Sequence, residues 1–519
     1  MDKIFYNTRL YTLTHPDQWA PAFLVRDGKI AALGSRAELA ALAHRPQYID
    51  LGGNYTYPGF TDAHVHLIGL GMTLQSLPLQ GRSLAEVLTL VKERAAEVPP
   101  GSWVMGRGFN YNSWPEGRPH RRWLDQAAPA TPVVLTAKDG HLIWVNSAAL
   151  QACGISRDTP DPKHGLIERD DSGEPTGLLL ENAISLVFEQ LPPPPPELRQ
   201  KAISDAVALL HSFGIVAAHD MGDGQALTAL QEYRASHGLS LRIWLAIPAS
   251  QLGSAAALGI RGGFGDQFLR IGAVKAFADG ALGARTAWML EPYTEDGGVG
   301  MPTLAQEELE ELVRAANGCG LPVAVHAIGD AANRAALDAI AACGDTKLRN
   351  RIEHVQLLNP TDVPRLAALN VTASMQPTQC PQDRYMADRY WGGRCRWAYP
   401  FRSLLKHGTH LAFGSDTPVE EADVLKGLYS AAARKRWDEP HTEPWYGEEA
   451  VSMWDALRAF TYGGAYAAAE EHYRGTLSPG MLADFVVLTG DILAVDDPET
   501  LKEVHVAATY VGGECVYEA

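Results

Sequence analysis

The sequence lacks several features that would assign it to other classes of protein. It has no run of 18 uninterrupted apolar residues, about the length that a membrane-spanning helix needs. The formal net charge is −17, so no excess of basic residues is present to bind the phosphate backbone of a nucleic acid. The first residues enter strand-like sequence at once and lack the apolar stretch of a signal peptide. We therefore expect neither a membrane span nor a nucleic-acid partner.

Cysteine is scarce and scattered. No two cysteines stand in a Cys-x-x-Cys pair, so the chain fits neither a zinc ribbon nor a disulfide framework. We expect reduced thiols in a cytoplasmic protein. The six residues concerned are Cys153, Cys319, Cys343, Cys380, Cys395 and Cys515.

The composition is that of a large globular protein. Hydrophobic residues make up 46% and charged residues 20% of the 519 residues, which argues against disorder. This length exceeds that of one simple domain, so we expect a large barrel with an accessory domain, or several domains.

Both ends of the chain have the sequence pattern of a small antiparallel sheet. Short strand-like runs fill residues 4–50, with Asp27-Gly28 as a hairpin turn, and similar runs fill residues 475–516. Neither end is long enough to form a stable domain alone, and open sheet edges are a liability. We therefore predict that residues 1–57 and 466–519 pair into one composite β-sandwich domain.

Between the ends, strand-like runs alternate with stretches rich in Ala, Leu and Glu. Eight alternations of strand and helix are typical of an α/β fold of the (β/α)₈ TIM-barrel type, here expected over residues 58–465. Residues 304–319 and 334–343 have the apolar spacing of outer helices. The predicted strands are 57–67, 214–219, 241–246, 269–275, 322–326, 351–355, 371–375 and 410–416.

This strand count requires an insertion after the first barrel strand. Residues 132–136 would otherwise be a ninth strand, so we interpret about 72–199 as an inserted lobe. The lobe ends with the proline run 192–196, which predicts a stiff, extended linker. A lobe at this point in the chain is expected to act as a lid that shapes the pocket at the barrel mouth.

Two histidines end the first strand. Alternate side chains of a strand share a face, so His64 and His66 would point to one side and could bind one divalent metal as neutral imidazoles. The pair alone is weak, because 17 histidines produce this spacing by chance. Hydrogen bonding of both rings to the backbone is the alternative.

Further polar residues stand at the ends of other predicted strands. In a barrel of this type the carboxyl ends of the strands meet at the active-site mouth. Each residue has another interpretation when taken alone, as a core histidine, a lysine reaching to solvent or a helix cap. Their joint placement is hard to obtain from packing alone and favours a metal site. The residues are His64, His66, Lys275, His326, His354 and Asp416.

The same residues lie within longer segments, and together these segments resemble the amidohydrolase superfamily. They are more closely similar to its YtcJ-like branch, which includes the N-substituted formamide deformylases. The resemblance covers nearly the whole chain. The segments are PGFTDAHVH at 58–66, VKAFADGALGART at 274–286, VHAIGD at 325–330, RIEHVQ at 351–356, FGSDTP at 413–418 and GTLSPGMLADF at 475–485.

The resemblance implies a set of metal ligands. Lys275 would bridge two divalent ions as an N-carboxylated lysine; if it stays unmodified, one ion with a nearby lysine as proton donor is the alternative. Histidine and carboxylate ligands suit Zn²⁺ best but admit Mn²⁺, Fe²⁺, Co²⁺ or Ni²⁺. One ion would be held by His64, His66 and Asp416, and a second by His326 and His354.

The implied reaction is hydrolysis of an amide-type, non-peptide C–N bond in a small organic substrate. Metal-activated hydroxide would attack the carbonyl, with Asp416 as general base and then general acid. An ester, lactone or cyclic ureide would suit the same site, and a non-catalytic binding or assembly protein is a remote alternative. A homodimer is a common arrangement for such a protein.

Substrate contacts are predicted from the same resemblance and from residue chemistry. His141 could donate a hydrogen bond to the developing oxyanion, or it could be a core histidine of the lobe. Aromatic walls could equally be packing, and an ion pair between Arg285 and Asp279 competes with a substrate role for Arg285. The predicted contacts are aromatic at Tyr111, Trp114 and Trp391, and polar at Arg285 and Gln376.

Overall fold

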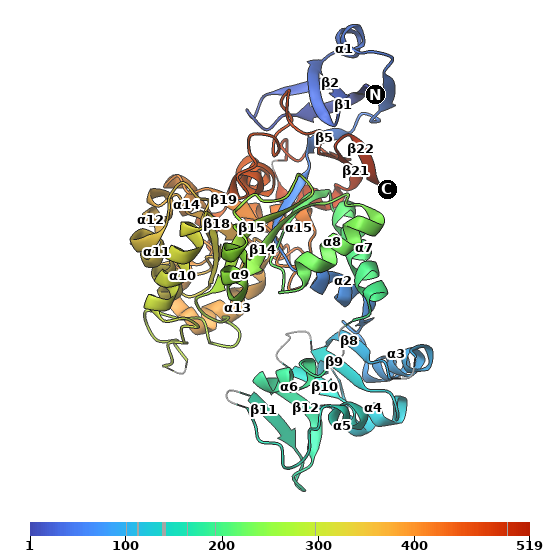
Figure 1. The fold of residues 1–519 in the computed structure, drawn as a ribbon, viewed down its shortest axis with the longest axis vertical. Coiled ribbons are helices and arrows are strands. Elements are labelled where there is room, and N and C mark those ends of the chain that lie inside the picture. The colour runs from blue at the N-terminus through green and yellow to red at the C-terminus, as the bar shows by residue number, and fades with distance from the viewer. Residues whose placement is uncertain are drawn as a thin grey trace. The chain divides into compact units, whose positions relative to one another are not determined.

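The computed structural model divides into two compact units, Met1–Gly69 with Ile203–Ala519, and Leu70–Ala202 (Figure 1). The structure describes residues 1–99, 101–111, 114–137, 142–162, 165–191, 194–295, 297–495 and 497–519. Within these residues, no helix has both the length and the apolar character needed to cross a membrane.

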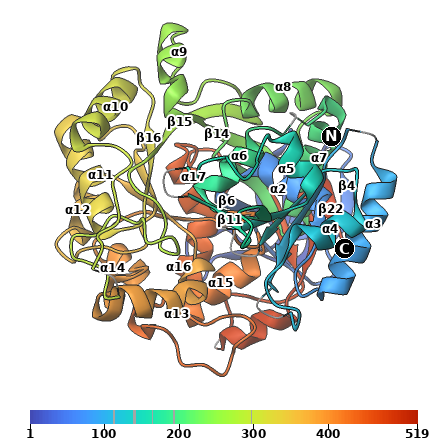
Figure 2. The same cartoon turned by 90° about the horizontal axis from the view of Figure 1, so that it is seen from below.

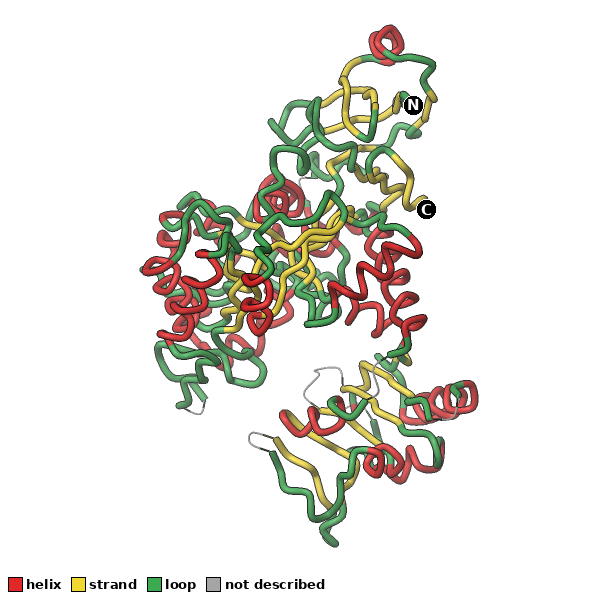
Figure 3. Tube along the Cα trace, in the orientation of Figure 1, coloured by secondary structure: helices red, strands yellow, loops and turns green. Residues whose placement is uncertain are grey.

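The larger unit contains an eight-stranded parallel sheet that curls into a nearly closed barrel. Figure 3 shows these strands with helices outside them. The predicted (β/α)₈ fold is confirmed, and each predicted barrel strand corresponds to an observed one. In order around the sheet, the strands are β6 (Phe60–Val65), β13 (Ile215–Asp220), β14 (Arg242–Pro248), β15 (Leu269–Phe277), β16 (Val323–Ala327), β17 (Arg351–His354), β18 (Thr372–Met375) and β19 (Leu411–Phe413).

The two edge strands of this sheet, β6 and β19, meet where their carboxyl ends leave the barrel. The backbone N–H of Asp416 donates to the carbonyl of His64 at 2.7 Å. The Asp62 carboxylate accepts hydrogen bonds from the backbone N–H and the hydroxyl of Ser415, at 2.9 and 2.6 Å. Polar contacts of the chain segment after β19 therefore close the barrel next to the candidate metal ligands.

Amphipathic helices cover the outside of the barrel (Figure 2). In α10 (Gln306–Gly318), Leu309 and Val313 are buried while the intervening charged residues face solvent. The predicted helices at 304–319 and 334–343 correspond to α10 and α11 (Asp330–Cys343). Other helices of this layer are α8 (Ala226–His237), α12 (Val363–Ala368), α14 (Phe401–Lys406) and α15 (Val424–Ala433).

The two ends of the chain share one eight-stranded sheet. Phe5, Phe23 and Phe485 pack together in its core, with ring centroids 4.9–5.0 Å apart. A buried ion pair between Arg242 of β14 and Asp484 joins this sheet to the barrel, with an Nε–Oδ2 distance of 2.6 Å. Its strands are β1 (Lys3–Tyr11), β2 (Trp19–Arg26), β3 (Lys29–Gly34), β4 (Gln47–Asp50), β5 (Tyr55–Pro58), β20 (Phe485–Leu488), β21 (Val506–Val511) and β22 (Glu514–Glu518).

The inserted unit has a sheet and a hydrophobic core of its own. Residues 133–137 form β9 of this sheet, which explains why the barrel has eight strands rather than nine. Helices α3 (Leu84–Glu97), α4 (Arg121–Ala127) and α5 (Ser147–Ala152) belong to the same unit. The strands, in sheet order, are β11 (Gly165–Arg169), β12 (Pro175–Glu181), β10 (Leu142–Val145), β9 (Val133–Ala137), β8 (Val104–Phe109) and β7 (Leu77–Pro78).

The seam between β6 and β19 leaves no space for a side chain at Gly414. A Cβ atom at this position would lie 2.5 Å from the His64 nitrogen and 2.6 Å from Asp62 Oδ1. Gly414→Ala should therefore lower the free energy of unfolding by about 1–3 kcal/mol, measured by urea denaturation. As a control, Gly253→Ala in α9 (Leu252–Ala257) meets no atom within 4 Å and should not lower stability. Equal stability of the Gly414→Ala variant and the parent would contradict this interpretation of the seam.

Candidate metal centre

Four imidazole rings form a continuous row at the carboxyl end of the barrel strands. The ring centroids of His66 and His64 are 5.6 Å apart, those of His64 and His354 4.9 Å, and those of His354 and His326 4.6 Å. His64 is in β6, His326 in β16 and His354 at the end of β17, while His66 directly follows β6. Strands far apart in the sequence thus bring all four predicted histidines together.

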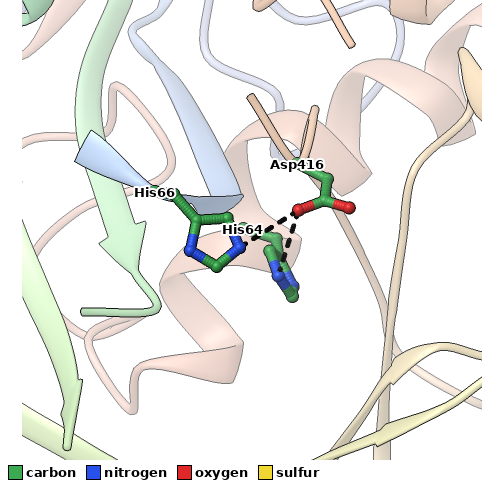
Figure 4. A group of neighbouring side chains, drawn as sticks. All are labelled: His64, His66 and Asp416. Atoms are coloured by element: carbon green, nitrogen blue, oxygen red, sulfur yellow. Dashed lines mark ion pairs between the residues drawn. The ribbon is translucent and has the colours of Figure 1, made fainter. Parts of the chain in front are cut away.

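Asp416 completes a three-residue group at one end of this row (Figure 4). Its Oδ1 lies 3.5 Å from His64 Nε2 and 3.4 Å from His66 Nε2. All three ligand atoms fall within 4.8 Å of one another, so they could hold one metal ion. The His64 side chain is buried, whereas that of His66 is 40% exposed and lies on the open side of the group.

The other two histidines each use one ring nitrogen for a local hydrogen bond. His326 Nε2 lies 3.0 Å from the carbonyl oxygen of Gly280, and His354 Nδ1 lies 2.8 Å from Gln376 Oε1. Since both acceptors are oxygens, each of these nitrogens carries the proton. The opposite ring nitrogen of each histidine therefore keeps a lone pair that a second ion could use.

Burial sets the protonation states that a metal site requires. It lowers the pKa of His354 to about 3 and that of His326 well below its usual value, so both rings are neutral near pH 7. Burial favours the neutral form of Asp416 as well, but the neighbouring His64 and His66 hold its pKa below the usual range. Neutral imidazoles and an ionised carboxylate are the forms that ligate metals.

The Lys275 amine lies within this cluster. The side chain of this β15 residue is buried, and no described residue accepts a hydrogen bond from its Nζ. Burial lowers the pKa of Lys275 to about 8, which raises the neutral fraction of the amine above that of an ordinary lysine, although the ammonium still predominates near pH 7. A buried nitrogen without an acceptor is costly unless another group binds it. The six residues fit a metal centre in which Lys275 participates.

Two candidate ligands of this cluster have unusual backbone conformations. His354 has φ = 74° and Asp416 has φ = 63°, both in the left-handed region. For residues other than glycine this conformation costs about 1–2 kcal/mol. Such strain persists where the surrounding fold enforces it, as it does at functional sites.

Three predicted substrate contacts lie in the barrel unit. Gln376 is fully buried and its Oε1 is bound to His354, so this residue orients a candidate ligand. Trp391, at the end of α13 (Gln379–Trp391), is also buried. The Arg285 guanidinium lies 5.6 Å from the centre of the Tyr390 ring. Substrate roles for these residues stay predictions.

The remaining predicted contacts belong to the inserted unit. Trp114 packs in the core of that unit and donates from its indole nitrogen to the carbonyl of Arg82 at 2.9 Å. The Tyr111 hydroxyl accepts a hydrogen bond from Arg118 at 3.3 Å. His141 lies outside the described residues, so its role as an oxyanion donor stays a prediction.

Sequence reasoning missed the residues that hold the ligands in place. Gln379 Nε2 donates to Asp416 Oδ2 at 3.1 Å, and Gln379 Oε1 in turn accepts from Gln356 at 3.0 Å. Behind His64 lies Glu353, paired with Arg351. One signal was available: Arg351 and Glu353 are charged residues two apart in a predicted barrel strand, and so share a face.

A (β/α)₈ barrel with this cluster at its carboxyl end defines the class of protein, a metal-dependent hydrolase. The Amidohydrolase family model Amidohydro_3 matches residues 47–517, and the chain belongs to this family. The predicted resemblance is thus confirmed.

Individual relatives extend over the whole chain. The YtcJ protein of Bacillus subtilis (strain 168) is 34% identical over 532 residues, covering 100% of both chains. The N-substituted formamide deformylase of Arthrobacter pascens is 30% identical over 544 residues, covering 100% of this chain and 98% of its own. An uncharacterized metal-dependent hydrolase from Pyrococcus horikoshii OT3 has a similar structure, with a TM-score of 0.83 and 28% identity over 95% of this chain and 99% of its own.

Proposed function

We propose that this protein hydrolyses an amide-type, non-peptide C–N bond in a small organic molecule. The observation that carries the proposal is the convergence of four imidazoles, a buried lysine and an ionised aspartate at the carboxyl end of the barrel strands. Similarity to an N-substituted formamide deformylase supports a C–N bond as the target.

The proposed metal is Zn²⁺, which histidine and carboxylate ligands suit. His64, His66 and Asp416 would hold one ion, His326 and His354 a second, and Lys275 would contribute to both. A divalent ion bound there acidifies water to a pKa of about 7 and polarises a substrate carbonyl. His326 and His354 are neutral near pH 7, which is the protonation state that metal binding needs.

Lys275 is proposed to act as a carboxylated lysine. The neutral amine can add to carbon dioxide, forming an N–C bond and releasing one proton, and the product is an anionic carbamate. An anion at this point would be compatible with nearby cations, whereas a free ammonium would be repelled by them. The lowered pKa of Lys275 favours the neutral amine that this addition requires.

Asp416 is proposed to move the proton during hydrolysis. Its carboxylate is ionised and can accept a proton from the attacking water, then deliver it to the departing nitrogen. Gln379, which donates to Oδ2, holds the carboxylate in one orientation while it does so. The exposed imidazole of His66 marks the side from which substrate would approach.

Substrate class is tested with a panel of N-formyl amides, N-acyl amides, esters, lactones and cyclic ureides. The metal-free protein should hydrolyse none of them, and protein reconstituted with Zn²⁺ should hydrolyse amides. Turnover confined to esters and lactones would overturn the amide assignment. Absence of turnover with Zn²⁺, Mn²⁺, Fe²⁺, Co²⁺ and Ni²⁺ would contradict an enzymatic role.

The role of Asp416 is tested by Asp416→Asn. Loss of the proton acceptor should lower kcat by about 10²- to 10⁴-fold while part of the metal is retained, measured by steady-state kinetics and metal analysis. Asp423→Asn is the matched control, because Asp423 caps α15 and asparagine caps a helix equally well. Appreciable turnover of the Asp416→Asn variant would leave ligation as the only role of this carboxylate.

Carboxylation of Lys275 is tested with carbon-13 bicarbonate and NMR. The metal-loaded protein should give a carbamate signal and bind two ions per chain. In Lys275→Met the signal should be absent, and one ion per chain should remain. A parent protein with one ion per chain and no carbamate signal would contradict the bridged pair.

A further inference from the structure

A buried ion pair lies directly behind His64. His64 Nδ1 is 2.7 Å from Glu353 Oε2, and Arg351 Nε donates to Glu353 Oε1 at 2.5 Å. A second Arg351 nitrogen donates to Glu353 Oε2 at 3.0 Å. All three side chains are buried, with at most 1% of their surface exposed. The barrel interior therefore holds a continuous chain from a candidate ligand to an arginine.

Hydrogen-bond geometry fixes the protonation state of this chain. Two nitrogens of the Arg351 guanidinium donate to the two oxygens of Glu353, at 2.5 and 3.0 Å, in the bidentate arrangement of an arginine–carboxylate pair. Glu353 is therefore a carboxylate, which can only accept hydrogen bonds. Nδ1 of His64 must carry the proton, so Nε2 keeps its lone pair, and Nε2 is the nitrogen that lies 3.5 Å from Asp416 Oδ1.

Arg351 also ties Glu353 to neighbouring strands. Its Nη2 donates to the carbonyl of Ala63 at 2.5 Å and to the hydroxyl of Ser374 at 2.6 Å, and its Nη1 donates to His219 Nδ1 at 2.7 Å. Ala63 precedes His64 in β6, so the same guanidinium holds both the backbone next to His64 and the carboxylate that orients its ring. The contacts join β6, β13, β17 and β18.

His354 and His326, the two histidines beyond His64 in the row, have different partners. His354 is bound to a neutral amide and His326 to a backbone carbonyl. Asp279 lies 3.6 Å from His326 Nε2, but its oxygens accept hydrogen bonds from the backbone N–H groups of Ile328 and Gly329 at 2.8–3.0 Å. His64 differs from both, because its partner is a carboxylate that is itself bound by an arginine.

Stability alone is a poor reason to keep such a pair. Moving two charges into a barrel interior costs about as much as their attraction returns, and apolar residues of similar size often serve as well or better. A carboxylate bound to a metal-ligating histidine fixes the tautomer and ring orientation and raises the basicity of the ligand.

We propose that Glu353, held by Arg351, is a positioning residue that fixes His64 for metal binding and sets the affinity of the ion position made by His64, His66 and Asp416. The inference deepens the proposed function, because it concerns the same metal centre. It depends on metal binding and not on which bond is cleaved.

The test measures Co²⁺ binding to metal-free protein by competition with a chromophoric chelator. Glu353→Gln should weaken Co²⁺ binding at the position made by His64, His66 and Asp416 by about 10- to 100-fold and should change the visible absorption spectrum of bound Co²⁺. Because Glu353→Gln leaves Arg351 buried without a counter-charge, the double variant Arg351→Met with Glu353→Gln is measured as well. It should fold and should bind Co²⁺ as weakly as the single variant.

Glu470→Gln is the matched control. Glu470 is a buried carboxylate paired with Arg474 and with Arg270, the latter at 2.5 Å, and in the described structure it has no hydrogen bond to a candidate ligand. Its loss should lower the melting temperature without changing Co²⁺ affinity or the Co²⁺ spectrum of the folded protein.

Two results would overturn the positioning role of Glu353, and a third would separate that role from the proposed function. Parental Co²⁺ affinity and spectrum in a folded Glu353→Gln or double variant would overturn the positioning role. Equal weakening in Glu470→Gln would do the same, since the effect would then be structural. If no variant or parent hydrolyses any substrate but Glu353→Gln still weakens Co²⁺ binding, the proposed function fails and the positioning role stands.

Discussion

The closing contact between β6 and β19 is the constraint on which the rest of the centre depends. The hydrogen bond from the backbone N–H of Asp416 to the carbonyl of His64 sets the distance between the first and last strands at their carboxyl ends. Asp62 adds two hydrogen bonds to Ser415 across the same seam. A side-chain-free Gly414 allows that approach. Asp62 and Ser415, 353 positions apart, thereby become neighbours. The left-handed conformation of Asp416 is maintained by its surroundings.

Burial influences the protonation states of the side chains at this end of the barrel. It keeps His326 and His354 neutral and lowers the pKa of Lys275 to about 8, so it disfavours the charged forms that would repel a cation. Counter-charges prevent the same burial from neutralising Asp416 and Glu353.

The fold and the candidate ligands could be predicted because both depend on short-range regularities. Strand-like runs recur between helical stretches, and His64, Lys275, His326 and His354 stand at or near the ends of such runs. The supporting contacts could not be predicted in the same way. That Glu353 faces His64, 289 residues away, and that Gln379 reaches Asp416 follow from strand order and side-chain rotamers. Gln376 is a second example. Its side-chain oxygen accepts a hydrogen bond from His354, and the residue type alone does not predict this contact.

The ligands and the surface that substrate would meet differ in how firmly the fold holds them. Ligands lie at or just after strand ends, and three of them are restrained by hydrogen bonds: Glu353 and Gln376 accept from histidines, and Gln379 donates to Asp416. Phe277, at the end of β15, is 49% exposed, and its ring centroid lies 5.1 Å from that of His326. Loops beyond the strands carry further exposed apolar residues, such as Met301 and Val419. Loop residues can change without disturbing the strand ends, so one metal centre can serve different substrates. This separation explains why family membership defines the hydrolytic chemistry more closely than it defines the substrate.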